Sequence, residues 1–534
     1  MKSKLTLVLA LALAACATPP AERPPLKLTI LHTNDHHGRF WTNGDGEGGM
    51  AARKTLIDRV RAEVKAAGGQ LLLLDGGDVN TGVPESDLQD AEPDFKGMNL
   101  LGYDAMAVGN HEFDRPPAVL ALQRKWAQFP LLSANIYQDG KRMFDSHTIF
   151  ERGGYRIAVM GLTTNDTARM VLPANIAGIE FRKPADEAAK LVPQLRAQAD
   201  MVIAATHMGH YTDGKSGVNA PGDVEMARAV PGLDLIVGGH SQNPVCMLMV
   251  NVRNDAYKPG QPCAPDRQNG AWIVQAHEWG KYVGRADFEL RAGSVQLVKY
   301  ELLPVNQWLR GPGTEKTLAT ERVPEDPQVR AFLQPFQDKG QAGLTVAVGQ
   351  TDEVLDGDRN RVRKQPTNLG TMVARAMMER TGADLGLMNS GGIRDSLPAG
   401  VITYRDVLKV QPFGNTVGVV TLSGAELLEV LRFAARMTPG AGAFPQTAGV
   451  KMRIRGGVLE SAQIGGREID PAGRYRLAIN NFTASGGDGY PPLDKHPGYI
   501  NSGFVDAEVL RAFLAARSPI KAADFAPADE VQRK

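Results

Sequence analysis

The chain has 534 residues, which is too long for one ordinary domain and suggests two large domains or three small ones. Apolar residues make up 43% and charged residues 22%, a balance that is typical of a globular protein and excludes a disordered or fibrous one. The 60 basic and 59 acidic residues leave a net charge of +1, so nothing in the charge balance favours nucleic-acid polymers or anionic membranes as partners.

The first sixteen residues have the layout of an export signal. Two lysines precede a short apolar run that ends in small residues before Cys16, and this run is too short to span a membrane. Residues 13–16 resemble a bacterial lipobox, in which Cys16 becomes the lipid-anchored N-terminus; the alternative is an ordinary cleaved signal with a chance cysteine. We therefore predict a signal peptide over 1–15, a flexible tether over 16–25, and a periplasmic protein anchored to the outer membrane by its lipid.

From residue 26 onward, short apolar β-like runs alternate with helical stretches, which predicts an α/β or layered α/β/α domain. Leu56, Val60 and Val64 recur at four-residue spacing, as in an amphipathic helix, and a similar pattern covers residues 185–199. The predicted strands lie within residues 26–32, 71–77, 104–110, 130–136, 156–162, 201–207, 234–240 and 272–277.

After Cys16, two cysteines remain, Cys246 and Cys263, separated by a loop rich in Asn, Asp, Pro and Gly. In an oxidising compartment this pair is expected to form a disulfide. Two free or metal-binding thiols are the alternative, but the chain has no second thiol pair to complete a thiolate site.

The pattern weakens over residues 311–345, which are polar and contain Pro and Gly, so we place the connection between two domains in this region. The predicted boundaries are a catalytic domain over 26–335, a linker or hinge over 336–358 and a second domain over 359–534.

Polar residues follow several of the predicted strands, at the strand ends where α/β folds collect their sites. Each one alone is weak evidence, because a single histidine at a strand end is more often a hydrogen-bonded surface or core residue than a ligand. Together they form a set of carboxylates, imidazoles and amides without thiolates: Asp35, His37, Asp78, Asn110, His111, Asp114, His207, His240 and Gln242.

Such a donor set suits borderline or hard divalent ions such as zinc, manganese or cobalt. Two ions about 3.5–4 Å apart can share one bridging carboxylate and clamp the attacking and leaving oxygens of an in-line displacement. We predict a site for two divalent metals, with Asp78 as the candidate bridge.

The ordered motifs NDHHG, GGD, GNHEFD, THMGH and GGHSQ resemble the calcineurin-like metallophosphoesterases of the 5'-nucleotidase family. The similarity extends from about residue 26 nearly to the end, through stretches such as NAPGDVEMARA and LKVQPFGN. It implies an N-terminal layered α/β/β/α metallophosphoesterase domain and a C-terminal α/β domain that holds the nucleoside.

The resemblance also implies individual roles. One metal takes Asp35, His37 and Gln242, the other takes Asn110, His207 and His240, and Asp78 bridges both. His111 and Asp114 are the catalytic pair, in which the imidazole stabilises charge on a phosphoryl oxygen and the carboxylate orients it. His36 is expected to be structural or to support the ligands, and an alternative for Asp114 is a cap of the helix that follows.

In the second domain, the matching motifs imply contacts to the nucleotide. Arginines suit forked contacts to phosphate or carboxylate oxygens, two phenylalanines can sandwich a base, and an aspartate suits ribose hydroxyls. On residue type alone, the phenylalanines would be core and the arginines solvated. The implied residues are Arg359, Arg363, Arg394, Phe413, Asn415, Gly442, Phe482 and Asp488.

The resemblance implies hydrolysis of nucleoside 5'-monophosphates and of UDP-sugars at the pyrophosphate, by a monomer whose second domain moves about the hinge. Alternative substrates are 2',3'-cyclic nucleotides, 3'-nucleotides and NAD. A lipid-anchored receptor that binds nucleotides or zinc without turnover is the alternative from a different class, and the catalytic pair argues against it.

Overall fold

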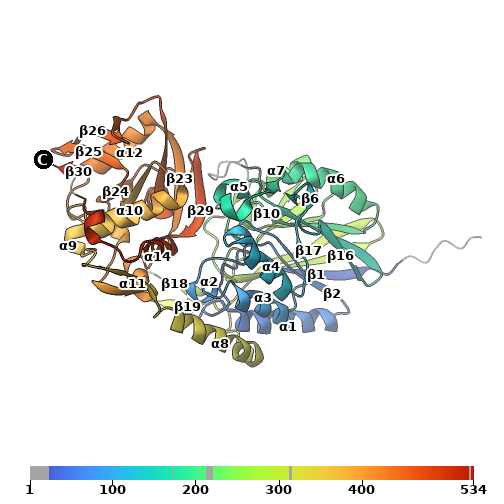
Figure 1. Cartoon of the computed structure of the whole chain (residues 1–534). Helices are drawn as coiled ribbons and strands as arrows, with labels where there is room; N and C mark the ends of the chain where they lie inside the picture. The colour runs from blue at the N-terminus through green and yellow to red at the C-terminus, as the bar shows by residue number, and fades with distance from the viewer. Residues whose placement is uncertain (1–22, 172, 212–219, 312–314, 528–530, 534) are drawn as a thin grey trace, which may run out of the picture.

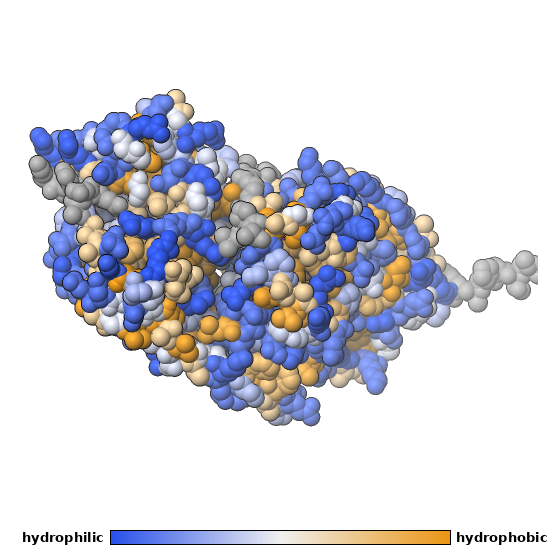
Figure 2. Space-filling view, in the orientation of Figure 1, coloured by the Kyte–Doolittle hydropathy of each residue, from blue (hydrophilic) through white to orange (hydrophobic). Residues whose placement is uncertain are grey.

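A computed structural model describes residues 23–171, 173–211, 220–311, 315–527 and 531–533. The predicted signal peptide and Cys16 lie outside the described residues. Within the described part of the chain, no helix is both long and apolar enough to cross a membrane. N-terminal and C-terminal elements form two bodies side by side (Figure 1), and hydrophilic residues cover most of the face seen in Figure 2.

Two six-stranded sheets form the centre of the N-terminal domain. The first has the order β17-β16-β1-β2-β3-β4 and the second β14-β15-β11-β10-β8-β7. β1 to β4 are parallel to one another, as are β8, β10, β11 and β15. The bounds are β1 Leu26–Thr33, β2 Gln70–Asp75, β3 Ala105–Ala107, β4 Leu131–Leu132, β7 His147–Arg152, β8 Tyr155–Thr163, β10 Met201–His207, β11 Leu235–Val237, β14 Asp266–Gln268, β15 Ala271–Val274, β16 Tyr282–Arg291 and β17 Ser294–Pro304.

Helices cover the outer faces of both sheets, which gives four layers. α1 (Met50–Ala66), α3 (Glu92–Leu101), α4 (Pro117–Trp126) and α8 (Pro327–Gly343) pack on the first sheet, and α6 (Pro184–Arg196) and α7 (Asp223–Ala229) on the second. On α1 the predicted apolar face is buried, and Leu56 and Val60 each contribute about 1.5–3 kcal/mol by burial. A separate apolar core fills the space between the two sheets. The implied α/β/β/α order is therefore confirmed.

A five-stranded mixed sheet of order β24-β21-β28-β23-β29 forms the centre of the C-terminal domain. One core contains α10, α11 and α14, and another joins the sheet to α12, β25 and β26. The bounds are α10 Asn368–Thr381, β21 Leu385–Asn389, α11 Tyr404–Val410, β23 Thr416–Ser423, α12 Gly424–Arg436, β24 Pro445–Ala448, β25 Val450–Arg455, β26 Val458–Ile464, β28 Arg474–Asn480, β29 Tyr499–Val505 and α14 Asp506–Arg517.

The chain passes from one domain to the other directly after α8. This helix contacts α1, α2 (Pro84–Asp87) and α3 of the N-terminal domain, and it runs across the predicted boundary at residue 335. β20 (Ala347–Thr351) then pairs with β22 (Gly400–Thr403) of the C-terminal domain. Only residues 344–346 separate α8 from β20. The domain boundaries remain a prediction. In the structure, residues 344–346 connect the last helix packed on the N-terminal domain to the first strand paired within the C-terminal domain.

The predicted disulfide is present, joining Cys246 to Cys263 with Cα atoms 4.7 Å apart. It closes a loop that contains the hairpin of β12 (Met247–Met249) and β13 (Val252–Arg253). The loop has little apolar core of its own, so the covalent link and a small cluster with Tyr282 of β16 and Leu302 of β17 hold it to the edge of the first sheet.

Candidate metal centre and nucleotide site

Each of the seven predicted metal ligands lies at or just after the carboxyl end of a parallel strand. Because parallel strands end at the same edge of a sheet, their following loops converge. The strands and their residues are β1 with Asp35 and His37, β2 with Asp78, β3 with Asn110, β10 with His207, and β11 with His240 and Gln242.

Tight turns hold most of these residues in an unusual backbone conformation. Five have φ between 49° and 75°, namely Asp35, His37, Asp78, His240 and Gln242. This region is unfavourable for residues with a Cβ, and it persists where the surroundings impose it, commonly at functional sites. Gly109 shows how closely the loops approach, because a Cβ there would lie 2.1 Å from Asp78 Oδ1.

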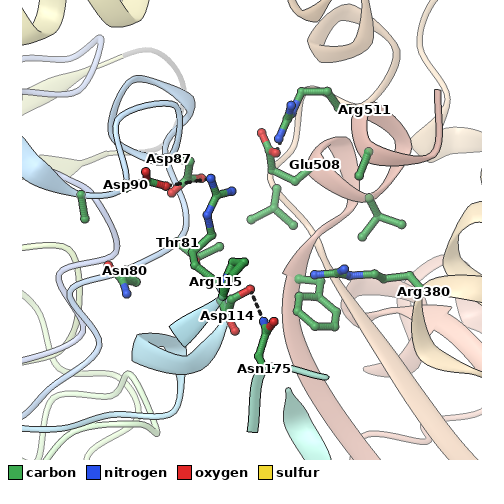
Figure 3. A pocket seen from close by; sticks show the side chains of 16 residues that line it. Asn80, Thr81, Asp87, Asp90, Asp114, Arg115, Asn175, Arg380, Glu508 and Arg511 are labelled. Carbon is green, nitrogen blue, oxygen red and sulfur yellow. Dashed lines mark hydrogen bonds and ion pairs between the residues drawn. The ribbon is translucent and has the colours of Figure 1, made fainter. Parts of the chain in front are cut away.

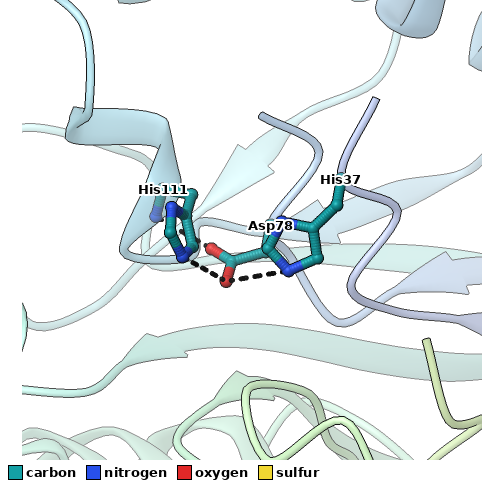
Figure 4. Close-up of side chains that lie close together, drawn as sticks. All are labelled: His37, Asp78 and His111. Carbon is teal, nitrogen blue, oxygen red and sulfur yellow. Dashed lines mark hydrogen bonds and ion pairs between the residues drawn. The ribbon is translucent and has the colours of Figure 1, made fainter. Parts of the chain in front are cut away.

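Asp78 is shared by two groups of potential ligands. His37, Asp78 and His111 form one group (Figure 4), and Asp78, His207 and His240 form the other; within each group the ligand atoms lie within 4.8 Å of one another. Asp78 Oδ2 lies 2.8 Å from His207 Nε2 and 3.9 Å from both His37 Nε2 and His111 Nε2. One carboxylate therefore faces both groups, which is the geometry expected of a bridging ligand.

Hydrogen bonds fix the tautomers of two histidines. His37 Nδ1 donates to the carbonyl oxygen of Thr81 at 2.8 Å, and His207 Nδ1 donates to that of Gly76 at 2.7 Å. In both rings Nε2 is thus left with its lone pair directed at the cluster, as in metal-binding histidines. His207 Nε2 makes no hydrogen bond with any residue that the structure describes.

The other predicted ligands present oxygen or nitrogen atoms to the same space. Asp35 accepts hydrogen bonds from Asn34 Nδ2 at 2.6 Å and from the His240 backbone nitrogen at 2.9 Å. Gln242 places its amide 2.8 Å from His37 Nε2. Asn110 Oδ1 is buried and lacks a hydrogen-bond partner among the described residues. An unpaired buried oxygen amid imidazoles and carboxylates fits a site for borderline or hard divalent cations.

The predicted catalytic pair lies in direct contact beside this cluster. His111 begins the short 3-10 helix η1 (His111–Phe113), and its Nδ1 lies 2.5 Å from Asp114 Oδ2. Burial lowers the pKa of His111, but the charges of Asp114 and Asp78 outweigh burial and raise this pKa to about 10. Asp114 does not cap α4, whose N-cap residue is Pro116, so its side chain serves the imidazole instead.

In the C-terminal domain the three predicted arginines lie close together. Burial lowers the pKa of Arg363, and the charges of Arg359 and Arg394 lower it further, while Asp488 raises it. The Arg394 guanidinium lies 5.5 Å from the ring centre of Phe413. Phe413 is 57% exposed, so its face is open to a second planar group.

The remaining predicted contacts surround Asp488. Asn389 Nδ2 donates to Asp488 Oδ2 at 2.8 Å, and a Cβ on Gly442 would lie 3.4 Å from the same oxygen. Phe482 is 44% exposed and lies against Gly487, next to Asp488. Asn415 differs from the others, because its carbonyl oxygen accepts from the Asp506 backbone nitrogen at 2.8 Å, at the start of α14.

Comparison with known proteins matches both halves of the chain to one family. Residues 28–244 match the calcineurin-like phosphoesterase model and residues 347–495 the 5'-nucleotidase C-terminal domain model. The chain is 54% identical to a 5'-nucleotidase of Vibrio cholerae over 99% of this chain and 98% of the relative. It is 56% identical to Protein UshA of Escherichia coli over 95% of this chain and 94% of that protein. The chain belongs to the 5'-nucleotidase family.

Solved structures agree with this membership. NAD nucleotidase from Haemophilus influenzae has a TM-score of 0.79 over 96% of this chain and 99% of that chain, and its 21% identity shows a common fold alone. A 5'-nucleotidase precursor from Thermus thermophilus is 30% identical, with a TM-score of 0.54 over 95% of this chain and 99% of that chain. The two-domain α/β fold is thus confirmed, and the chain is a metal-dependent hydrolase of the phosphoesterase type.

In this 5'-nucleotidase family member, the two domains meet at the catalytic pair. A cavity of about 270 Å³ lies between them. As Figure 3 shows, Asp114 and Arg115 line it from the N-terminal domain and Arg380 and Glu508 from the C-terminal domain. Beside it, Gly503 of β29 lies on the His111 ring, where a Cβ would come within 2.2 Å of His111 Nε2. His111 is therefore covered in this arrangement of the domains.

Two supporting residues were not predicted from the sequence. Glu112 accepts hydrogen bonds from the backbone nitrogens of Val79 at 2.9 Å and Gly109 at 2.7 Å, and so joins the loops after β2 and β3. Asn34 holds Asp35 and also donates to the backbone of His277. Both residues lie inside the recognised motifs, and that position was the signal that could have identified them.

His36 occupies a supporting position, away from the ligand cluster. Arg53 donates to His36 Nδ1 at 2.9 Å, so His36 Nε2 carries the proton and donates to Asp94 Oδ1 at 2.8 Å. Burial lowers the pKa of His36 well below its ordinary value, and the Arg53 charge lowers it further. A neutral His36 thus fixes the loop between Asp35 and His37 to α1 and α3.

Proposed function

We propose that this chain hydrolyses nucleoside 5'-monophosphates to nucleoside and phosphate, and UDP-sugars at the pyrophosphate. The observation that carries the proposal is the Asp78 carboxylate, which faces two groups of imidazoles next to the His111–Asp114 pair. The names of the relatives, 5'-nucleotidase and UshA, and the resemblance of both domains to nucleotide-cleaving enzymes support the choice of substrates.

The proposed ligands divide between two positions. Asp35, His37 and Gln242 would hold one divalent cation, the set Asn110, His207 and His240 would hold the other, and the Asp78 carboxylate lies between the two sets. Zinc, manganese and cobalt suit these donors. Cations bound there would supply Lewis-acid polarisation of the phosphoryl oxygens and a nucleophile at neutral pH.

His111 and Asp114 act on the charge that develops during displacement. Because Nδ1 is held by Asp114, the Nε2–H of the imidazolium is free to donate to a phosphoryl oxygen once Gly503 has moved away. In the overall reaction the oxygen of water bonds to phosphorus, the bond from phosphorus to the leaving oxygen breaks, and one proton of water ends on the leaving oxygen. A donor fixed in this way stabilises the transition state more than the ground state.

The C-terminal residues supply recognition of the nucleoside. Phe413 and Phe482 expose ring faces that can enclose a planar base, and Asp488, held by Asn389, can accept from ribose hydroxyls. Arg359, Arg363 and Arg394 add a concentration of positive charge that suits the anionic part of the substrate.

The setting of the enzyme is proposed from the N-terminal sequence. An export signal followed by Cys16 supports a periplasmic protein tethered to the outer membrane by a lipid, and the tether leaves the catalytic domain free of membrane contact. We further propose that the enzyme acts as a monomer, because both halves of the candidate site lie on one chain.

Replacement of His111 tests catalysis against simple binding. His111→Ala is expected to keep the metal content and to lower phosphate release at least ~100-fold, the usual scale for a lost acid–base or electrostatic group. His147→Ala, on β7 and away from the cluster, is the matched control. Unchanged turnover in His111→Ala would refute the role of the catalytic pair.

A substrate panel on the same preparation tests the reaction itself. We expect release of phosphate from AMP and UMP, and of UMP and glucose 1-phosphate from UDP-glucose, with little turnover of 3'-AMP, 2',3'-cyclic AMP or NAD. Preference for one of the last three substrates would replace the proposed function with that of a specialised relative.

A further inference from the structure

A second cavity is lined by residues of the N-terminal domain, among them Asn243, the chain neighbour of the proposed ligand Gln242. Its volume is about 510 Å³, within the range of roughly 300–1,000 Å³ that holds for small-molecule sites, whereas the interdomain cavity falls just below it. Four segments line the cavity: Asn243 and Pro244, the disulfide-closed loop with Arg253 and Tyr257, the segment from His277 to Tyr282, and Gln307.

The walls of this cavity are continuous with the loops that carry the metal ligands. Asn243 directly follows Gln242 in the chain, and the backbone of Pro244 pairs with that of Ala276. The backbone nitrogen of Trp279 donates to the Asp35 carbonyl oxygen at 2.7 Å. A group bound in the cavity therefore lies within a few residues of the ligand cluster along two separate loops.

Aromatic rings form one side of the cavity. The His277 ring stacks on Tyr282 with centroids 6.0 Å apart, and Tyr257 packs on the same ring at 6.1 Å. His277 has a φ of 66°, and its buried Nδ1 lacks a hydrogen-bond partner among the described residues. Glu278 Oε1 lies 3.7 Å from this Nδ1, and a strained residue whose buried polar atom makes no hydrogen bond is a feature of binding sites.

Charged and amide groups form the other side. Arg253 pairs with Asp255 at 2.7 Å, and Lys281 pairs with Glu278 at 2.6 Å. The Asp255 side chain is 78% exposed, and such exposed pairs are worth about 0–1 kcal/mol, so a phosphate can replace the carboxylate at Arg253. Amides from Asn243, Asn254 and Gln307 add hydrogen-bonding groups around the rings.

We propose that this cavity binds the glycosyl phosphate half of a UDP-sugar. The proposal rests on the function proposed above and extends it to the sugar end of that substrate. A sugar ring presents an apolar face to aromatic rings and hydroxyls to amides, while its phosphate suits Arg253 and Lys281.

The shape of the substrate supports this placement. The base and the sugar lie at opposite ends of the pyrophosphate, and the exposed phenylalanines for the base belong to the C-terminal domain. With the nucleoside-bound phosphate at the cluster around Asp78, the glycosyl phosphate extends over the N-terminal domain, toward the cavity whose walls continue from the ligand loops. The Cys246–Cys263 disulfide then has a specific use, since it holds the loop that carries Arg253 and Tyr257.

A comparison of UDP-glucose with UMP tests the subsite. Both substrates carry the same base and are cleaved at the same cluster, so the ratio of their kcat/KM values isolates contacts to the sugar half. Tyr257→Ala and Arg253→Ala are each expected to lower this ratio, UDP-glucose over UMP, about ten-fold or more. Val250→Ser is the matched control, because Val250 is 70% exposed on the same loop and does not line the cavity.

Two further measurements separate recognition from loss of structure. Tyr257→Phe keeps the ring and is expected to retain a ratio close to that of the unchanged chain. Glucose 1-phosphate, used as an inhibitor of UMP hydrolysis, is expected to bind about ten-fold more weakly to Tyr257→Ala, whereas inhibition by inorganic phosphate stays the same.

The outcomes distinguish the two proposals. If the unchanged chain does not cleave UDP-glucose, the second activity of the proposed function is wrong, and the subsite is wrong with it. If UDP-glucose is cleaved but the ratio is the same in Tyr257→Ala, Arg253→Ala and Val250→Ser, the proposed function holds and the subsite is overturned.

Discussion

Glu112 offers a sharp test of how the loops around Asp78 are positioned. Its two carboxylate oxygens accept from the backbone nitrogens of Val79 at 2.9 Å and Gly109 at 2.7 Å. Hydrogen bonds to a charged group contribute about 1.5–3 kcal/mol each. Glu112→Gln has the same shape but one acceptor oxygen, so its amide nitrogen must face one of the two N–H groups. We expect the loop that bears Asp78 to shift and the metal affinity to fall by about 10–100-fold, the usual effect of losing a group that supports a ligand.

The assay is phosphate release from UMP as a function of added metal, together with the metal content of the purified protein. Glu112→Gln should need a higher metal concentration for half-maximal activity, and excess metal should restore much of the rate. Glu92→Gln is the control, since Glu92 pairs with Lys96 on the partly exposed face of α3. An identical metal dependence in Glu112→Gln and the unchanged chain would refute the reasoning.

Four other predictions follow from the described structure. Burial raises the pKa of Asp506 to about 7. The folded protein therefore binds the proton of this carboxyl group more tightly than the unfolded protein does. The free energy of unfolding consequently decreases as pH rises from about 4 to about 7. Asp506→Asn should remove this loss and stabilise the protein at about pH 8 by up to about 4 kcal/mol, with a smaller gain at about pH 5, as measured by urea denaturation; an equal gain at both pH values would contradict this account. Chelation with EDTA should abolish phosphate release, and zinc, manganese or cobalt should restore it, whereas activity that survives full metal removal, verified by elemental analysis, would argue against the metal site. Joint replacement of Cys246 and Cys263 by serine should destabilise the fold by about 3 kcal/mol in denaturant, and no change would show that the loop is held by packing alone. Gly503→Ala would place a Cβ 2.0 Å from His111 Cε1; we expect β29 to separate from His111, seen as a changed small-angle X-ray scattering profile, and an identical profile would count against this packing.

The sequence predicted which polar residues gather around Asp78, because each of them follows an apolar strand within a short motif. Each parallel strand fixes the direction in which the loop after it leaves the sheet. Loops that follow neighbouring parallel strands therefore lie next to one another at the same edge of the sheet. The eight predicted runs all contain strands, from β1 to β15. The hairpin of β16 and β17 was not predicted, because its alternating pattern covers a half-exposed surface and lacks a continuous apolar run.

Supporting contacts could not be read from the sequence in the same way. Glu112 bonds backbone groups 33 residues earlier, and such bonds leave no side-chain pattern to detect. The contact between Gly503 and His111 joins residues from different domains, so it depends on the orientation of the whole C-terminal sheet. The cavity beside the disulfide is assembled from four chain segments whose residue types, taken separately, are ordinary for a protein surface.

The contact at Gly503 bears directly on the predicted hinge. His111 is 5% exposed, and the backbone of β29 occupies the position next to Nε2 that a phosphoryl oxygen must reach. If His111 donates to the phosphoryl group as we propose, β29 must move away from η1 during turnover, because Gly503 covers Nε2 in this arrangement of the domains. Residues 344–346 connect α8, which packs on the N-terminal domain, to β20, which belongs to the C-terminal domain. We propose that rotation about this short segment uncovers His111 and Asp114 and carries the base, which would link the choice of nucleotide in one domain to the chemistry in the other.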